Sequence, residues 1–502
     1  MNKNRHDFFA AMEAQWVELS LSEGLLLPGY STTPPAAVNI ESHFSRNVPL
    51  LRPLVSAAMN TVTEHKLAVA MARAGGLGII HRYLTPEGQA EQVTKVRANL
   101  HALIVHPKTI LEDQTVEEVE NWRRQNDREY QTFPVINNDD RVVGLMTKND
   151  FDHCSNSNQQ IRDAMTPLDQ LVTALPGTSL EEAYVKMGKK NVLLLIDEDG
   201  KLAGMYVFRD VKRNRGGNRD GYNTDTTGNL RVGAAIGTDE ASFERARVLA
   251  RAGTNVVVID TAHGHTELLL RIVRDLRQAS WMNGIDIVAG NVVTGEAAKA
   301  LVDAGADGIK VGIGPGSICT TRIVSGAGRP QLTAIYDSAK AIEGSGVPVC
   351  ADGGIKYSGN ITVALAAGAH SVMLGSLLAG TEESPGERIL VDGKRSVRYL
   401  GMGSLEAMMT NPGAADRYKQ GGVGKDLLVP EGVPGAVPEK GPVAKVLHQL
   451  AGGLRSGMFY LGVADIASLQ ENARFIRINS EGNRESHPHS VVITNEAPNY
   501  RP

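Results

Sequence analysis

Eight short apolar runs constrain the fold of this chain more than any other feature of its sequence. They lie at residues 53–59, 76–81, 230–236, 256–260, 286–290, 308–312, 347–352 and 371–375. Segments with a helical pattern lie between them, for example at residues 63–74, 243–252, 295–304 and 360–367. Short buried strands that alternate with helices form parallel βαβ units. Eight units predict an α/β fold of the (β/α)8 TIM-barrel class. A doubly wound open sheet is the alternative, and the number of runs argues against it.

An internal repeat interrupts this alternation after the second run. Residues 115–119 recur at 179–183, residues 134–139 at 194–199, and residues 143–150 at 203–210. A period of about 60 residues is too long for most solenoid repeats. The pair resembles tandem CBS motifs, which in many proteins bind adenine or guanine nucleotides in the cleft between the repeats. A rigid or oligomer-forming insert without a ligand is the alternative.

These patterns predict the domain organisation. We expect a discontinuous barrel at residues 1–102 and 229–502, a CBS pair at 103–213 with repeats at 103–153 and 163–213, and a linker at 214–228. The linker is rich in Arg, Asn, Gly, Asp and Thr, which is typical of a mobile segment.

Composition excludes several classes of protein. The 52 Lys and Arg and 56 Asp and Glu side chains give a formal net charge of −4, and 42% of the residues are hydrophobic. Neither a disordered chain nor a polycation that binds nucleic acid has this balance. The three cysteines form no CxxC pair, which favours a reducing compartment. Without a signal-peptide pattern or a run of about 18 apolar residues, we expect a cytoplasmic protein and no membrane association.

A glycine-rich loop that ends on a cysteine follows the sixth run. Residues 310–322 read KVGIGPGSICTTR. The glycines permit positive φ and bring backbone amides close to an anion, which suits a phosphate. Arg322 and the local N–H dipoles favour the reactive thiolate of Cys319. The loop therefore predicts a bound phosphate beside a nucleophile; a structural turn with an inert cysteine is the alternative.

Polar residues follow the apolar runs at their carboxyl ends, which meet on one rim of a barrel. The candidates are Ser56, Met59, Asp260, Thr261, Asn291, Asp352, Gly353, Gly354, Gly375 and Ser376. A carboxylate such as Asp352 can accept both hydroxyls of a ribose, and glycines at the last two strands offer amides to a phosphate. The rim therefore predicts a mononucleotide site. We interpret His263 and His265 as loop residues, because no third metal ligand accompanies them.

Four motifs give the chain a specific resemblance. Residues 312–322, 351–355, 399–404 and 484–489, together with the CBS pair, resemble the inosine-5′-monophosphate (IMP) dehydrogenase family. The resemblance implies NAD-dependent oxidation of IMP to xanthosine 5′-monophosphate, the committed step of guanine nucleotide synthesis. Cys319 would attack C2 of the hypoxanthine ring, hydride would pass to NAD, and the covalent thioimidate would be hydrolysed.

The resemblance also implies residue roles. The catalytic residues would be Cys319, Thr321, Arg417, Tyr418 and Glu431. Contacts to IMP would come from Ser56, Met59, Ser317, Asp352, Gly353, Gly354, Gly375, Ser376, Tyr399, Gly401, Met402, Gly403 and Glu431. Contacts to NAD would come from Asp260, Thr261, Asn291, Gly312, Gly314 and Arg322. Residues 411–442 would form a mobile flap that carries the hydrolytic arginine, with a disordered surface loop as the alternative.

The resemblance also implies a bound potassium ion and a homotetramer, which possibly pairs into an octamer. The ion would be held by carbonyl groups of Gly314, Gly316 and Cys319, and of Glu485, Ser486 and His487 from a neighbouring subunit. Three places depart from the family pattern: Asn60 stands where many members have Asp, Leu194 where proline is usual, and the linker differs. The last two weaken the case for a regulatory nucleotide at the CBS pair.

Two other functions stay open. GMP reductase shares the barrel, the cysteine loop and the bound nucleotide, but takes hydride from NADPH and releases ammonia. A non-catalytic nucleotide-sensing protein would use the barrel only for binding. Arg417 and Tyr418 favour the dehydrogenase, because a reductase has no water to activate, and an intact set of catalytic residues argues against the sensor.

Overall fold

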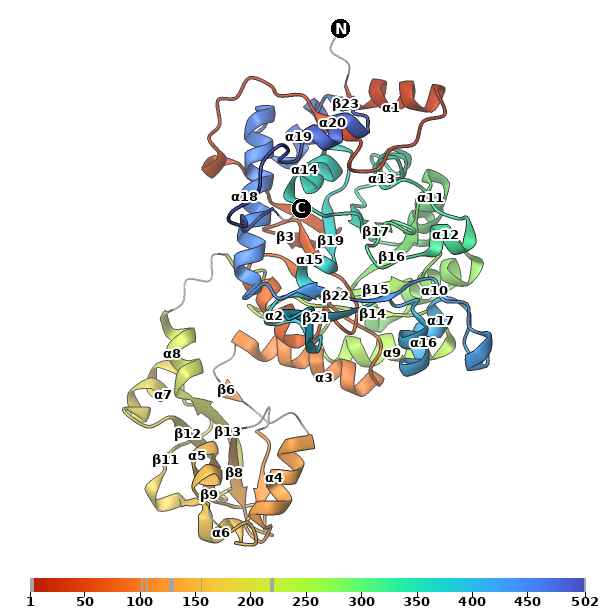
Figure 1. Ribbon diagram of the computed structural model, residues 1–502. Helices are drawn as coiled ribbons and strands as arrows, with labels where there is room; N and C mark the ends of the chain where they lie inside the picture. Colours follow the sequence, from red (N-terminus) through yellow and green to blue (C-terminus); the bar gives the residue numbers. More distant parts are fainter. Residues whose placement is uncertain are drawn as a thin grey trace. The chain divides into compact units, whose positions relative to one another are not determined.

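The computed structural model describes residues 4–100, 103–104, 107–125, 131–154, 156–216 and 221–500 of the 502-residue chain. The chain divides into two compact units. Met1–Arg97 and Asp220–Pro502 form the first, called here the barrel unit, and Ala98–Arg219 form the second, the insert unit. Figure 1 shows the elements of each.

A closed parallel barrel forms the centre of the barrel unit, in the order β14-β15-β16-β17-β18-β19-β4-β5. Its strands are β4 (Leu54–Ser56), β5 (Leu77–Ile80), β14 (Gly233–Ile236), β15 (Val256–Asp260), β16 (Asp286–Val292), β17 (Gly308–Val311), β18 (Val349–Asp352) and β19 (Ser371–Leu374). Each lies within or overlaps one of the eight apolar runs, and the barrel prediction is confirmed. The strands are short and buried because inward side chains such as Val55, Val258 and Val288 fill the barrel interior.

Helices cover the outside of the barrel. They are α2 (His65–Arg73), α3 (Pro86–Arg97), α9 (Glu240–Arg251), α10 (Glu267–Gln278), α11 (Gly295–Ala304), α13 (Gln331–Ala341), α14 (Ser358–Ala366) and α18 (Val443–Leu461). Local signals set their ends. Thr294 caps α11 by accepting from the amide of Ala297, and Gly305 ends that helix in the left-handed region at φ 106°.

Additional elements close the two ends of the barrel. The hairpin of β2 (Ser42–Ser45) and β3 (Val48–Leu50) packs against the barrel at the amino ends of its strands, where the amide of Arg46 donates to the carbonyl of Asp307. Nearby lie α1 (Arg5–Ala14), α19 (Ile466–Asn472), α20 (Ser480–Glu485), and the pair of β1 (Gly24–Leu26) and β23 (Phe475–Arg477).

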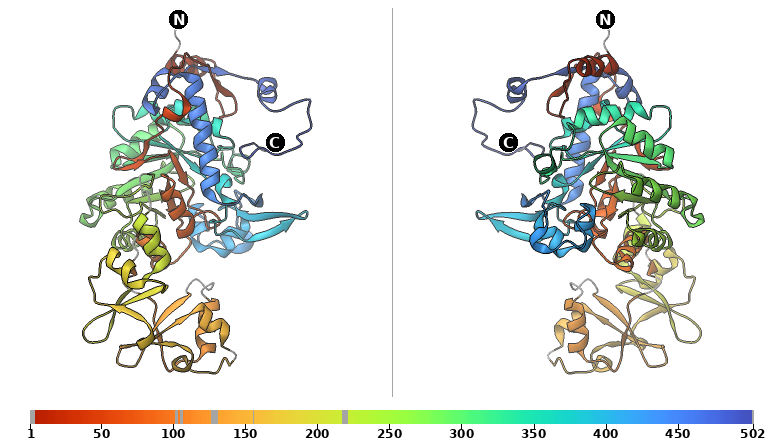
Figure 2. Two further views of the ribbon diagram at one scale, coloured as in Figure 1. Left: turned by 90° about the vertical axis from the view of Figure 1, so that its left-hand side faces the viewer. Right: turned by 90° about the vertical axis from the view of Figure 1, so that its right-hand side faces the viewer.

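Further elements of the barrel unit include the segment predicted as a flap. A three-stranded sheet consists of β20 (Arg388–Val391), β21 (Lys394–Leu400) and β22 (Pro434–Pro438), and Figure 2 shows its β20–β21 hairpin projecting from the barrel unit. The helices α12 (Thr321–Ser325), α15 (Ser376–Ala379), α16 (Leu405–Thr410) and α17 (Pro412–Arg417) are short. Residues 411–442 thus contain α17, the turn Lys425–Leu427 and β22.

The insert unit contains two similar halves. The first half has β6 (Leu103–Ile104), β7 (Ile110–Leu111), α4 (Val116–Gln125), β8 (Thr132–Ile136), β9 (Val142–Thr147) and α5 (Lys148–His153). The second has β10 (Thr166–Pro167), β11 (Val172–Ala174), α7 (Leu180–Met187), β12 (Val192–Ile196), β13 (Leu202–Val207) and α8 (Phe208–Gly216). α6 (Ile161–Ala164) lies between the halves.

The halves exchange their first strands. The two sheets run β10-β9-β8-β7 and β11-β12-β13-β6, so that β6 joins the sheet of the second half and β10 that of the first. A shared core of Val142, Leu145, Leu194 and Met205 links the sheets. Leu194 is 1% exposed in this core.

Two parts of the segment predicted as a mobile linker, residues 214–216 and 221–228, lie among the described residues. Residues 214–216 belong to α8, and residues 217–220 lie outside the described residues. Asn223 is buried and donates to the carbonyls of Pro49 and Gly76, and Asp225 pairs with Arg97. These contacts anchor residues 221–228 to the barrel unit, which corrects the prediction, because composition does not reveal long-range partners.

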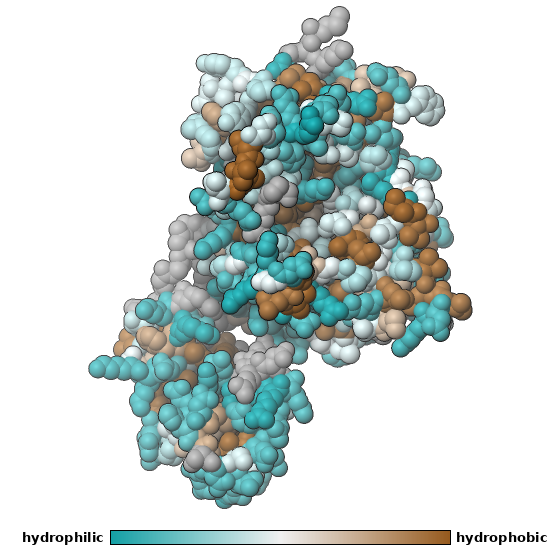
Figure 3. Space-filling view, in the orientation of Figure 1, coloured by the Kyte–Doolittle hydropathy of each residue, from teal (hydrophilic) through white to brown (hydrophobic). Residues whose placement is uncertain are grey.

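The surface carries a few exposed apolar groups. Figure 3 shows hydrophobic side chains on the right-hand side of this face, where Figure 1 places α12. Ile323 and Val324 of that helix are 88% and 46% exposed. In the described part of the chain, no helix combines the length and apolar character needed to cross a membrane.

Candidate active site

A pocket lies at the carboxyl ends of the barrel strands and is lined by most of the residues expected there. They are Met59, Asp260, Thr261, Asn291, Gly312, Gly314, Gly316, Ser317, Cys319, Thr321, Asp352, Gly353, Gly354, Gly375, Ser376, Tyr399, Gly401, Met402, Gly403, Arg417, Tyr418 and Glu431. They come together because parallel strands of a barrel place all their following loops on one rim.

Five expected residues do not line the pocket. Ser56 is fully buried in β4 and accepts a hydrogen bond from Thr63. Arg322 turns away and donates to the carbonyls of Ile313 and Arg329. Glu485, Ser486 and His487 lie at the end of α20 and just beyond it.

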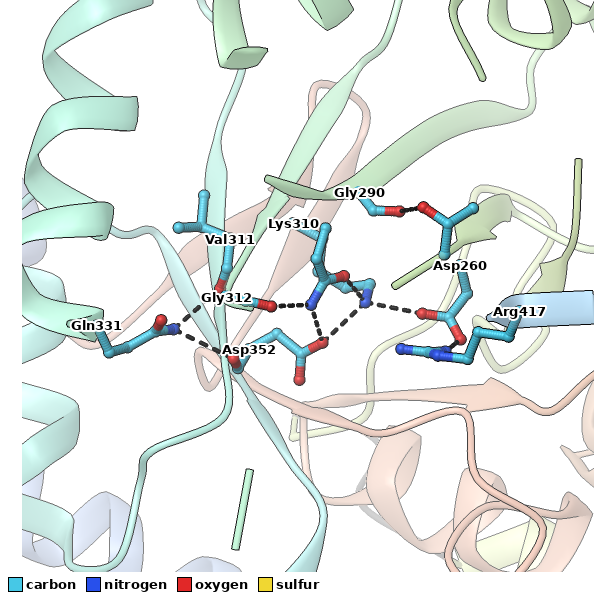
Figure 4. Close-up of polar contacts among 10 residues, drawn as sticks. Asp260, Gly290, Lys310, Val311, Gly312, Gln331, Asp352 and Arg417 are labelled. Atoms are coloured by element: carbon cyan, nitrogen blue, oxygen red, sulfur yellow. Dashed lines mark hydrogen bonds and ion pairs between the residues drawn. The ribbon is translucent and has the colours of Figure 1, made fainter. Parts of the chain in front are cut away.

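A buried lysine forms the floor of the pocket (Figure 4). The Nζ atom of Lys310 lies 2.9 Å from Oδ1 of Asp260 and 2.8 Å from Oδ2 of Asp352, and it also donates to the side-chain oxygen of Asn291. The lysine side chain is 2% exposed. A buried ammonium requires such partners, because desolvation of an unpaired charge costs several kcal/mol. Lys310 therefore fixes two carboxylates from different strands at one point.

The carboxylate of Asp352 is held on one side only. Its Oδ2 accepts from Lys310 at 2.8 Å and from Nδ2 of Asn291 at 3.0 Å. The backbone carbonyl of the same residue accepts from Gln331 at 3.1 Å. Its Oδ1 receives no hydrogen bond from the described residues, and the side chain is 20% exposed toward the pocket. One oxygen is therefore fixed and the other is available to a hydroxyl group.

The cysteine loop is joined to the flap segment by backbone hydrogen bonds. The amide of Thr320 donates to Glu431 at 2.9 Å, and the amide of Val433 donates to Ile318 at 3.0 Å. The thiol of Cys319 lies 3.2 Å from the hydroxyl of Thr321. The loop thus presents a thiol and a hydroxyl side by side in the pocket.

The flap segment reaches the floor of the pocket. Arg417 pairs with Oδ2 of Asp260, whose other oxygen binds Lys310. Tyr418 packs on the core of α16 and α17 beside Met402, and burial raises the pKa of its phenol to about 12. A Cβ atom at Gly403 would lie 2.6 Å from the ring of Tyr418, so a glycine is needed for this approach.

Tyr399 lines another side of the pocket. Burial raises the pKa of its phenol, which therefore stays protonated as a hydrogen-bond donor at neutral pH. A Cβ atom at Gly375 would lie 2.6 Å from its hydroxyl oxygen. The close approach places that hydroxyl beside the backbone that begins α15.

The other cysteines and the histidines of the 263–265 loop take no part in this geometry. Burial raises the pKa of the Cys350 thiol to about 12, because the side chain lies in the barrel interior. Across the residues that the structure describes, no group of three His, Cys, Asp or Glu side chains could hold a metal ion.

Comparison with known proteins identifies the family. The family described as "IMP dehydrogenase / GMP reductase domain" matches residues 18–489. The chain belongs to the IMP dehydrogenase / GMP reductase family. It is 46% identical over 487 residues to the inosine-5′-monophosphate dehydrogenase of Aquifex aeolicus, with 96% of this chain and 97% of that protein covered.

Other relatives give the same assignment. The inosine-5′-monophosphate dehydrogenase of Bacillus subtilis is 46% identical over 486 residues, covering 96% of this chain and 97% of that protein. A crystal structure of GMP reductase from Trypanosoma brucei, in complex with guanosine 5′-monophosphate, matches with a TM-score of 0.80 and 38% identity. That match covers 96% of this chain and 100% of the other.

The sequence alone does not identify two polar residues that support this site of the IMP dehydrogenase / GMP reductase family. The sequence patterns assign no role to Lys310, although it begins the cysteine-loop motif, and none to Gln331. A lysine inside an otherwise apolar strand is the signal that could have identified the first, since a buried lysine needs partners. Gln331 donates to the carbonyls of Val311 and Asp352, and no local pattern marks such a contact.

Proposed function

We propose that the chain catalyses the NAD-dependent oxidation of IMP to xanthosine 5′-monophosphate, the committed step of guanine nucleotide synthesis. One observation carries the proposal: the Cys319 thiol, the Thr321 hydroxyl and the flap residues Arg417 and Tyr418 line the same pocket. The identity of 46% to inosine-5′-monophosphate dehydrogenases over nearly the whole chain supports it.

The substrate would be held at three points. The free Oδ1 of Asp352 accepts from the ribose hydroxyls, while Lys310 and Asn291 hold its Oδ2. Backbone amides at Gly354 and Gly375, with the Ser317, Ser376 and Tyr399 hydroxyls, bind the phosphate. Met402, Gly401, Gly403 and Glu431 lie against the purine. These contacts place C2 of the base near Cys319.

The reaction proceeds in two stages at Cys319. Loss of the Cys319 thiol proton to solvent gives a thiolate whose sulfur would bond to C2 as hydride leaves that atom, and a bound NAD would supply the two-electron acceptor for the hydride. The resulting thioimidate is attacked by water at C2, and the C2–S bond breaks to return the thiol and release the product. Arg417, in its neutral form after it has left Asp260, would take the proton from this water, with Thr321 and Glu431 as a second route.

Asp260 couples the two stages. Its carboxylate pairs with Lys310 through one oxygen and with Arg417 through the other. Binding of the ribose of NAD at Asp260, Thr261 and Asn291 would require Arg417 to give up its partner. Hydride transfer and hydrolysis would therefore use the same carboxylate in turn, first for the dinucleotide and then for the flap.

A potassium ion fits the cysteine loop. The carbonyl oxygens of Gly314 and Cys319 accept no hydrogen bond from the described residues, and that of Gly316 accepts only from the amide of Cys319. At the end of α20 the carbonyl groups of Glu485 and Ser486 also lack helical donors, whereas the carbonyl of His487 lies 3.0 Å from Nδ1 of His489. These are the ligands that a hard monovalent cation prefers. They would hold the ion between two subunits and order the loop.

This arrangement implies a homotetramer. The exposed side chains of Ile323, Val324, Leu390 and Val391 supply apolar surface for subunit contacts. Pairing of tetramers into octamers would use the insert unit, which we propose to be a CBS pair that binds an adenine or guanine nucleotide. Three cysteines without a disulfide are consistent with a cytoplasmic location.

GMP reduction is the second candidate, favoured by the match to the Trypanosoma brucei enzyme with a TM-score of 0.80. Oxidation of IMP reduces NAD to NADH, whereas reduction of GMP oxidises NADPH. The purified chain is therefore supplied with IMP and NAD, or with GMP and NADPH, and absorbance at 340 nm is followed. A rise with IMP and NAD supports the proposal, a fall with GMP and NADPH establishes the reductase, and no change in either establishes a non-catalytic sensor.

A further inference from the structure

A second polar cavity lies at the other end of the barrel from Cys319. It is lined by residues just before β18 and β19, including Val347 and His370, whereas the catalytic loops follow the same two strands. The α1 and α19 helices pack together beside it, at the upper end of the barrel unit in Figure 1. The cavity holds about 490 Å³, within the range of small-molecule sites.

Basic side chains dominate this cavity. Arg5, Arg46, His43 and His370 line it, and among the described lining residues Glu343 is the one acid. Arg5 meets this acid through a 3.4 Å ion pair, but the carboxylate is 59% exposed. Solvent therefore screens this ion pair, and Glu343 neutralises the positive charge of Arg5 only in part.

Arg5 carries a buried nitrogen without a partner. Its side chain is 14% exposed, and Nη1 is buried with no hydrogen bond among the described residues. The same atom lies 3.5 Å from the position that a Cβ atom at Gly368 would take, which places it against the cavity wall. A buried guanidinium nitrogen without an acceptor is costly, and an anion in the cavity would remove that cost.

The other donors converge from different elements. Arg46, which follows β2, makes a 3.7 Å ion pair with Asp307 through Nε and places Nη1 3.3 Å from where a Cβ atom at Gly346 would lie. The amide of Val349 donates to Nδ1 of His370 at 3.3 Å, so a neutral His370 carries its proton on Nε2 and is a donor there. Burial, with repulsion from His43 and Arg5, lowers the pKa of His370 to about 4. His43 and Arg5 therefore lie close to this ring.

We propose that this cavity binds a phosphate-bearing small molecule. Two guanidinium groups and an imidazole N–H match the several acceptor oxygens of a phosphate, for which arginine is a preferred partner. The site is separate from the substrate phosphate site, and its occupation leaves Cys319 free. The ligand would bind at the amino ends of β18 and β19. The carboxyl ends of the same strands lead to Asp352 and Gly375, which are proposed to contact the substrate.

The test is calorimetric titration of the full-length protein with inorganic phosphate. One equivalent of IMP per chain, without NAD, first fills the catalytic phosphate site, which is proposed to hold IMP through its ribose and base as well. We expect phosphate to bind still, and Arg5→Gln to weaken this binding at least about tenfold, since hydrogen bonds to charged groups are among the stronger ones. Arg271→Gln, an exposed arginine on α10, is the matched control and should leave binding unchanged.

Glu343→Gln separates ligand binding from a folding defect. It removes the acid that competes for Arg5 and should tighten phosphate binding, which a damaged fold cannot do. Titrations of the wild type and of Arg5→Gln with GMP and with ATP then distinguish free phosphate from a nucleotide as the ligand. The ligand is the compound whose affinity depends most on Arg5. Equal phosphate binding by the wild type and Arg5→Gln, or no binding once IMP is bound, would overturn the proposal.

Discussion

Replacement of Lys310 by methionine tests the charge network at the floor of the pocket. Methionine keeps most of the unbranched side chain but removes the charged amino group, and it leaves the carboxylates of Asp260 and Asp352 without their shared cation. At an effective dielectric constant of about 20, each contact near 2.8–2.9 Å represents roughly 6 kcal/mol of Coulomb attraction before desolvation is subtracted. Removal of one partner of a buried pair costs about 3–5 kcal/mol.

We expect a loss of about 3 kcal/mol, at the lower end of that range. Asp352 is 20% exposed and keeps its bond from Asn291, and Asp260 keeps Arg417. The assay is urea unfolding followed by circular dichroism, together with the KM for IMP. That constant should rise roughly tenfold, because Asp352 loses the hydrogen bond that orients it.

Lys299→Met is the matched control. Lys299 makes an i,i+4 pair with Asp303 at 3.0 Å, but both side chains are more than half exposed, at 64% and 60%. Such a pair contributes at most about 0.5 kcal/mol. If Lys310→Met lowers the free energy of unfolding no more than Lys299→Met, the buried lysine does not hold the two carboxylates. A double variant with Asp260→Asn should lose less than the sum of the single changes, since the two residues are in contact.

Three further predictions concern the reaction and the insert unit. Cys319→Ala should abolish hydride transfer yet still bind IMP in a calorimetric titration, because the phosphate and ribose contacts lie elsewhere; NADH formation by this variant would refute the nucleophile. Arg417→Ala should give a normal first burst of NADH in stopped flow and then stall as the covalent adduct, with the steady rate about 10²–10⁴-fold lower; loss of the burst itself would contradict the assignment. Deletion of residues 98–219 with a short glycine linker should leave an active enzyme, because the ion pair of Arg97 with Asp225 holds the two ends of the barrel unit together; an insoluble or inactive product would show that the insert unit is needed for folding.

Local patterns in the sequence determine the barrel. Each apolar run is five to seven residues long and most are bounded by glycine or polar residues, and buried parallel strands have this form. The capping residues Thr294 and Ser179 sit at helix starts where sequence rules place them. Because eight such units close in only a few ways, the barrel and the rim of candidate residues can be predicted without coordinates.

The direction and pairing of individual side chains required the tertiary structure. The sequence placed Ser56 and Arg322 at the site, but barrel closure buries the first and turns the second toward the carbonyl of Ile313. It gave no role to Lys310, whose partners are 42 and 50 residues away in the chain. Residue type and spacing report what a segment prefers locally, whereas the partner of a buried charge depends on which strands become neighbours. Only the closed barrel brings those strands together.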